Sequence, residues 1–94
     1  MSGTTLNAGN LDPLRRKLLF RAWHRGMREM DLLMGAFADA HIETMTDDEL
    51  QQFEQIITYP DADLFKWFKG EDEIPDHYDL PLLRRFLSFK IPGI

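Results

Sequence analysis

The amino-acid sequence predicts an all-α fold, a small single domain of about five short helices. Apolar residues recur three and four positions apart in several segments, which is the spacing of one helix face. No segment alternates apolar and polar residues as a half-exposed strand does. With 94 residues, 44% of them hydrophobic and 12% aromatic, the chain can form one core but not two domains. We place the helical domain at residues 12–90, between a disordered N-terminal tail, 1–11, and a C-terminal tail, 91–94.

The first helix begins at Asp12-Pro13, because aspartate caps a helix N-terminus and proline is tolerated at the first helical position. Basic residues fall on its outer side, and its apolar stripe consists of Leu14, Leu18, Leu19, Ala22 and Trp23. Gly26 is the expected left-handed residue that ends this helix.

The second helix carries Glu29 and Asp31 in its opening turns, where the helix dipole favours anions. Its apolar stripe consists of Met27, Met30, Leu33, Met34 and Phe37. The third helix begins at a capping box formed by Thr46 and Glu49, with Met45 and Leu50 as its hydrophobic staple. Its buried face consists of Leu50, Phe53, Ile56 and Ile57.

Tyr59-Pro60 ends the third helix, because the residue before a proline avoids the helical conformation. Asp61 is the expected cap of a short fourth helix that Gly70 closes, with Leu64, Phe65, Trp67 and Phe68 as its apolar residues. An acidic loop follows, and Asp79 and Pro81 open a fifth helix through Leu82, Leu83, Phe86 and Leu87.

Charge is distributed unevenly along the chain, whose net charge is -5. Six of the eleven basic residues precede Glu29, whereas the segment 39–63 holds eight acids and no lysine or arginine. This pattern predicts a polarised surface that orients a partner. Clustered arginines also bind nucleic acid, but the acidic remainder would repel a polyanion, so we expect no nucleic-acid partner.

Residues that could perform catalysis or bind a metal are scarce. The three histidines lie in separate segments, the two serines are Ser2 and Ser88, and there is no cysteine. A Ser/His/Asp triad is therefore not expected, and no histidine has the spacing of a zinc motif. The six glycines form no phosphate-binding loop. We expect neither a catalytic nor a metal site.

The segment around Gly26 is the main candidate for recognition of another protein. A glycine between Arg25 and the charged pair Arg28-Glu29 permits close backbone approach, and guanidinium groups supply directional hydrogen bonds. If the chain turns at Gly26, Arg25 and Glu29 lie at a corner and project outward. The alternative is a plain helix-ending glycine with unrelated charges beside it, and the spacing alone favours that alternative.

The segment 25–31, RGMREMD, resembles the RGxxE signature of the succinate dehydrogenase flavinylation factors, also called SdhE or succinate dehydrogenase assembly factor 2. The resemblance extends to the basic-apolar segment ending in Trp23-His24-Arg25. It also includes TDDEL at 46–50, FEQII at 53–57 and DADLFKW at 61–67, in the family's order. It covers residues 14–70.

This resemblance implies a non-catalytic five-helix protein that binds the flavoprotein subunit of succinate dehydrogenase and promotes covalent attachment of FAD to it. Fumarate reductase flavoproteins are implied as further clients in bacteria. By position, the implied partner-binding residues are Arg25, Gly26, Arg28, Glu29 and Asp31. No stably bound cofactor is expected, because FAD belongs to the client.

Two other functions compete with this one. An FAD carrier would stack Trp23 or Trp67 on the flavin, although helical spacing favours the core for both rings. The less favoured third function is a small nucleic-acid-binding protein. The chain has neither a signal nor a transit pattern and no long apolar run. We therefore expect a cytoplasmic bacterial protein without membrane insertion, monomeric when free.

Overall fold

The computed structural model describes residues 8–89, which contain five α-helices. These are α1 (Pro13–Trp23), α2 (Arg28–His41), α3 (Asp47–Ile56), α4 (Asp61–Phe68) and α5 (Pro81–Leu87). Short 3-10 turns lie at Ala8–Asn10, Ile42–Thr44 and Asp76–Tyr78, and no strand occurs within the described part of the chain. The predicted all-α class and the five helices are confirmed.

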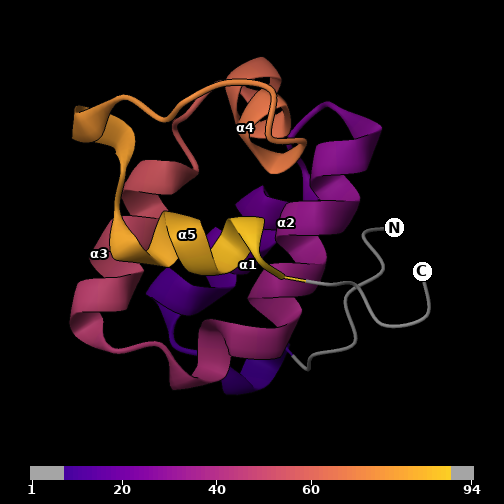
Figure 1. The fold of residues 1–94 in the computed structure, drawn as a ribbon. Coiled ribbons are helices and arrows are strands. Elements are labelled where there is room, and N and C mark those ends of the chain that lie inside the picture. Colours follow the sequence, from indigo (N-terminus) through magenta and orange to yellow (C-terminus); the bar gives the residue numbers. More distant parts are fainter. Residues whose placement is uncertain (1–7, 90–94) are drawn as a thin grey trace.

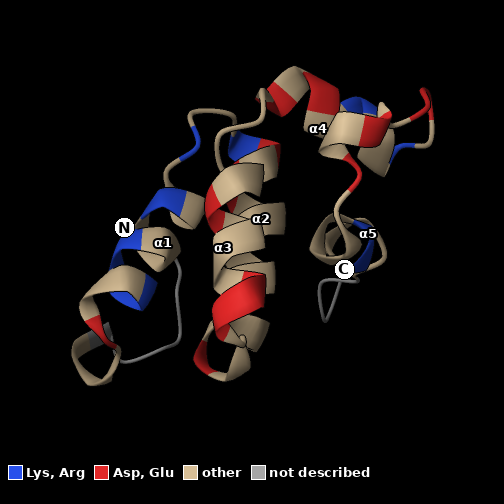
Figure 2. Ribbon diagram, turned by 90° about the vertical axis from the view of Figure 1, so that its left-hand side faces the viewer, with Lys and Arg blue, Asp and Glu red and all other residues tan. Residues whose placement is uncertain are grey.

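The helices form three layers. The helices α2 and α3 lie in the middle layer, with α1 on one side of them and α5 on the other (Figures 1 and 2). The helix α4 lies at the end of the bundle where α2 begins (Figure 1). This arrangement brings the link between α1 and α2 next to the link between α3 and α4.

The core is built from the apolar faces that the sequence predicts. Phe37 of α2 lies at its centre, with ring centroids 6.1 Å from Phe53 of α3 and 5.4 Å from Phe86 of α5. Two expectations at the N-terminus are wrong. Leu14, assigned to the stripe of the first helix, is 36% exposed, whereas Leu11, assigned to the disordered tail, is 8% exposed and belongs to the core. Tail residues 1–7 and 91–94, and Lys90, lie outside the described residues.

Three helix ends follow the local rules. Asp12 caps α1 by accepting a hydrogen bond from the amide of Arg15. The Thr46–Glu49 capping box is present, with hydrogen bonds of 3.1 and 2.9 Å. Gly70, at φ +73°, ends α4 in a Schellman motif: its amide bonds the Trp67 carbonyl and that of Glu71 bonds the Lys66 carbonyl. These ends are set by local sequence, as predicted.

Two other helix ends differ from prediction. The helix α1 ends at Trp23, three residues before Gly26, so this glycine belongs to the link and is not the helix cap. At α4, Pro60 occupies the N-cap position and Asp61 makes no capping bond. The Asp61 carboxylate instead forms an ion pair with Arg25, which is 36 residues away in the chain. Long-range pairing therefore replaces the local role at this aspartate.

The contact between α1 and α2 depends on Gly35. A Cβ at this glycine would lie 2.2 Å from Cδ2 of Trp23, so the indole lies directly on the backbone of α2. The indole Nε1 donates a 3.1 Å hydrogen bond to Asp39, which fixes the orientation of the ring. This packing sets the position at which α1 ends and the link begins.

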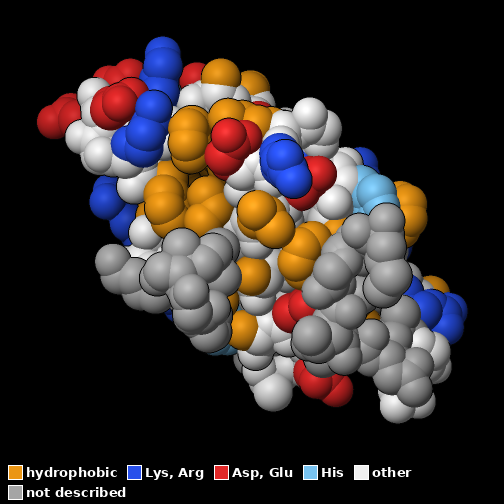
Figure 3. Space-filling model, turned by 90° about the vertical axis from the view of Figure 1, so that its right-hand side faces the viewer, with side chains coloured by type: hydrophobic (Ala, Val, Ile, Leu, Met, Phe, Trp, Pro, Cys, Tyr) orange, Lys and Arg blue, Asp and Glu red, His pale blue; other side chains and the backbone are white. Residues whose placement is uncertain are grey.

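Three large hydrophobic side chains are exposed among the described residues. They are Leu14 and Phe20 of α1, at 36% and 63%, and Leu32 of α2, at 47%. Figure 3 shows hydrophobic side chains grouped on the side of the molecule that carries α2. No helix in the described part of the chain has the length and apolar character needed to cross a bilayer.

Candidate partner-binding surface

The corner between α1 and α2 consists of the link 24–27 and the first two residues of α2, Arg28 and Glu29. Gly26 adopts φ +102°, in the region that L-residues with a side chain rarely occupy. A Cβ built on Gly26 would meet nothing within 4 Å, and the residue is exposed. Glycine is thus required here by the backbone conformation, and the space in front of it is open.

Asp31 holds this corner from within the chain. Its Oδ1 accepts hydrogen bonds from the backbone amides of Arg25 and Gly26, the second at 3.2 Å. Both amides lie before α2, where Met27 at the N-cap position has no side-chain capping bond. The half-buried carboxylate of Asp31 therefore does the work of a cap from one turn inside the helix.

The side chain of Arg25 joins the corner to the link between α3 and α4. Its Nε donates to Oδ1 of Asp61 at 2.7 Å, and its Nη2 lies 2.7 Å from the same oxygen. Nη1 donates to the carbonyl of Ile57, and Nη2 to that of Tyr59 at 2.6 Å. These carbonyls follow the end of α3, where backbone acceptors have no helical partner. One guanidinium thus satisfies both carbonyls and the carboxylate.

The expectation that the Arg25 side chain projects outward is wrong. Only 7% of this side chain is exposed, against 20% for Asp61. Its guanidinium turns inward because the two carbonyls of the α3–α4 link and the Asp61 carboxylate bind it by stronger hydrogen bonds than water does. No local pattern predicts this contact, because the acceptors lie 32 to 36 residues away in the chain.

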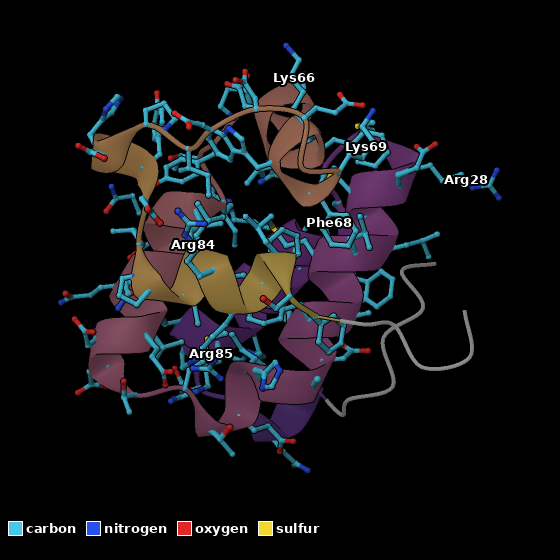
Figure 4. The ribbon with its side chains drawn as sticks, in the orientation of Figure 1. Arg28, Lys66, Phe68, Lys69, Arg84 and Arg85 are labelled. Atoms are coloured by element: carbon cyan, nitrogen blue, oxygen red, sulfur yellow. The ribbon has the colours of Figure 1, made fainter. Side chains whose placement is uncertain are left out.

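Arg28 and Glu29 form the outward part of the corner. Both are exposed at the start of α2, and within residues 8–89 neither side chain makes a hydrogen bond or ion pair. Figure 4 shows Arg28 extending away from the first turn of α2. The five predicted residues therefore lie together but divide in two: Arg25 and Asp31 hold the corner, while Gly26, Arg28 and Glu29 face outward. Whether they contact a partner stays a prediction.

A cleft of about 340 Å³ adjoins this corner, lined by Arg21, His24, Arg25, Ile57, Tyr59, Pro60 and Asp61. A second cleft, of about 530 Å³, lies between α4 and α5, and its lining includes Trp67, Arg84 and four acidic residues of the 71–79 loop. Trp67 reaches the second cleft, but most of its ring is buried. Trp23 and Trp67, the rings considered for flavin stacking, are only 9% and 8% exposed. Within residues 8–89, no three His, Asp or Glu side chains gather as metal ligands do.

The family model described as "Flavinator of succinate dehydrogenase" matches residues 16–90. The chain belongs to this family. This match includes the whole corner and continues past Gly70, so it also covers α5.

Curated relatives of the flavinator family are similar to this chain over most of its length. "FAD assembly factor SdhE" of Acetobacter pasteurianus is 44% identical over 79 residues, 84% of this chain and 72% of that protein. The protein of the same name from Idiomarina loihiensis is 34% identical over 67 residues, 71% of this chain and 74% of the relative. "Succinate dehydrogenase assembly factor 2, mitochondrial" of Dictyostelium discoideum is 35% identical over 74 residues, which is 79% of this chain but 52% of the relative. The comparison with solved structures finds no match.

Proposed function

We propose that this protein is a non-catalytic assembly factor, which binds the flavoprotein subunit of succinate dehydrogenase and promotes covalent attachment of FAD to it. The observation that supports this most is the family match across residues 16–90. The names of its relatives, an FAD assembly factor and a succinate dehydrogenase assembly factor, agree with it. We further propose that the protein acts in the bacterial cytoplasm as a monomer and serves fumarate reductase flavoproteins as well.

The contact with the client is assigned to Gly26, Arg28 and Glu29. Gly26 leaves the backbone open to close approach, and the two charged side chains beside it are exposed and uncommitted. Arg25 and Asp31 act indirectly, because they hold the backbone that presents these groups. The contact surface is thus preorganised by the fold, which lowers the entropy cost of binding.

The proposed mechanism is differential binding. The factor binds the client conformation in which FAD and the acceptor histidine are aligned for bond formation better than it binds other conformations. It thereby raises the population of that state without supplying a catalytic group. FAD carriage by the factor is not favoured, because both tryptophan rings lie in the core.

The experiment is to produce the flavoprotein subunit of succinate dehydrogenase in cells that lack any other such factor, with and without this protein. Covalent flavin on the subunit is scored by in-gel fluorescence after denaturation, and copurification of the two chains is scored in parallel. We expect copurification and a severalfold rise in covalent flavin. Equal flavin in both samples, with no copurification, would refute the proposed function.

A further inference from the structure

The outer face of α1 is basic although the chain as a whole is acidic. This helix holds four cations, Arg15, Arg16, Lys17 and Arg21, and no acid. Arg15 is used internally: its guanidinium donates to the carbonyls of Ile42 at 2.8 Å and Met45 at 2.6 Å. The other three are exposed, and no hydrogen bond or ion pair of their side chains occurs among the described residues.

Phe20 lies in the middle of these cations. At 63% exposure it is the most exposed large hydrophobic residue of the described chain. It follows Arg16 by four positions and Lys17 by three, adjoins Arg21, and stacks on His24 with ring centroids 3.9 Å apart. Residues three or four positions apart are neighbours on a helix, and Arg21, four positions after Lys17, extends the same stripe. We call this set, Arg16, Lys17, Phe20, Arg21 and His24, the α1 face.

The α1 face contributes little to the stability of the isolated protein. Lys17 and Arg21 are like charges four residues apart, which is mildly destabilising on a helix. Four cations elsewhere in the described chain are paired: Arg25 with Asp61, Lys69 with Glu71, Arg84 with Asp79 and Arg85 with Glu49. Figure 2 shows Lys and Arg along α1 and Asp and Glu on α3 and α4. An aromatic ring amid unpaired cations is the composition of a binding surface.

We propose that the α1 face docks an acidic segment of the client flavoprotein, with Phe20 entering an apolar pocket beside it. This inference rests on the proposed function and extends its contact surface beyond the corner. His24 is the first residue of the corner, and the cleft of about 340 Å³ is lined by Arg21 and His24 together with Arg25. The α1 face and the corner therefore adjoin, and one partner can contact both.

A protein segment fits this surface better than a nucleic acid does. The chain carries a net charge of -5, with eight acids and no lysine or arginine in residues 39–63. These acids would repel an extended polyanion, whereas a short acidic segment can contact the α1 face alone. Phe20 also needs an apolar partner to be buried, which a phosphate backbone does not offer.

The test compares two triple charge reversals that change the net charge equally. One converts Arg16, Lys17 and Arg21 to glutamate. The control converts Lys66, Lys69 and Arg84 to glutamate as well. These residues lie on α4, just after α4 and on α5 (Figure 4). Affinity for the purified flavoprotein subunit is measured by calorimetry at low and moderate salt, after circular dichroism has confirmed the fold of each variant.

We expect the α1 reversal to weaken binding at least about tenfold and the control reversal less than about threefold. Phe20→Ser should weaken binding about tenfold, as loss of an apolar anchor does. Added salt should weaken the wild-type complex and have less effect on the α1 variant. The single substitutions Lys17→Glu and Lys66→Glu repeat the comparison should a triple variant misfold.

Three results would overturn the inference. Equal affinities of the two triple variants, while Glu29→Arg does weaken binding, would reject the α1 face and leave the proposed function intact. Absence of any binding between wild-type protein and flavoprotein would reject both together. Retention on DNA at moderate salt that depends on Arg16, Lys17 and Arg21, with no effect of these residues on flavoprotein binding, would assign the α1 face to nucleic acid.

Discussion

Arg25→Ala should destabilise the protein by about 3 kcal/mol, since removal of one partner of a largely buried ion pair leaves the other charge uncompensated. The substitution would strand the Asp61 carboxylate and the carbonyls of Ile57 and Tyr59. For a domain of this size the melting temperature should fall by roughly 12–24 °C. Thermal and urea unfolding followed by circular dichroism measure both quantities.

Two further variants at this corner test whether the Arg25 hydrogen bonds cause the loss of stability. Arg25→Lys keeps the charge but has no planar fork, so it should recover only part of the lost stability. Arg28→Ala removes an exposed arginine without a partner and should change the free energy of unfolding by less than about 0.5 kcal/mol. If Arg25→Ala were as stable as Arg28→Ala, the inward role of Arg25 would be wrong.

Gly26→Ala should abolish client binding while only moderately destabilising the fold. A side chain at φ +102° costs about 1–2 kcal/mol, but the new Cβ would meet nothing within the protein. Any larger loss must then come from a partner that approaches the backbone. Affinity for the flavoprotein subunit and covalent flavin yield measure that loss, and unfolding experiments measure the strain.

Gly70→Ala is a matched control for this substitution. Gly70 also has positive φ, +73°, and a Cβ on it would likewise meet nothing within 4 Å. The two variants should lose similar stability, but Gly70→Ala should retain client binding, because Gly70 ends α4 and lies outside the corner. Equal loss of binding in both variants would show that the effect of Gly26→Ala is one of stability alone.

The parts of the fold that local signals govern are the parts that the sequence predicts. Asp12, the Thr46–Glu49 capping box and Gly70 act within one turn of their own helix, so a short window of sequence is sufficient to assign them. Apolar spacing placed Phe37, Phe53 and Phe86 in one core for the same reason. The family signature further located the corner, which spacing alone left undecided.

Which charged residues of the corner point inward and which project outward depends on contacts between residues far apart in the sequence. Arg25 pairs with Asp61, but any of the eight acids in 39–63 could have been its partner on sequence grounds. Asp61 directly follows the proline that ends the third helix, and an aspartate between two helices is predicted to cap the second of them. Phe20 lies outside the predicted apolar stripe of the first helix. Its exposure among three cations depends on how the helices pack, which the spacing of apolar residues does not predict.

The central claim is that the outward side of the corner contacts a flavoprotein client. Its most direct test is the affinity of Glu29→Arg for the flavoprotein subunit, compared with Asp47→Arg. Both acids are exposed in the first turn of a helix, and neither has a hydrogen-bond or ion-pair partner within the described residues. The two substitutions should therefore destabilise the fold by similar amounts, because each places a cation at a helix N-terminus. We predict at least about a tenfold loss of affinity for Glu29→Arg and little change for Asp47→Arg. Wild-type affinity in a folded Glu29→Arg variant would contradict the account.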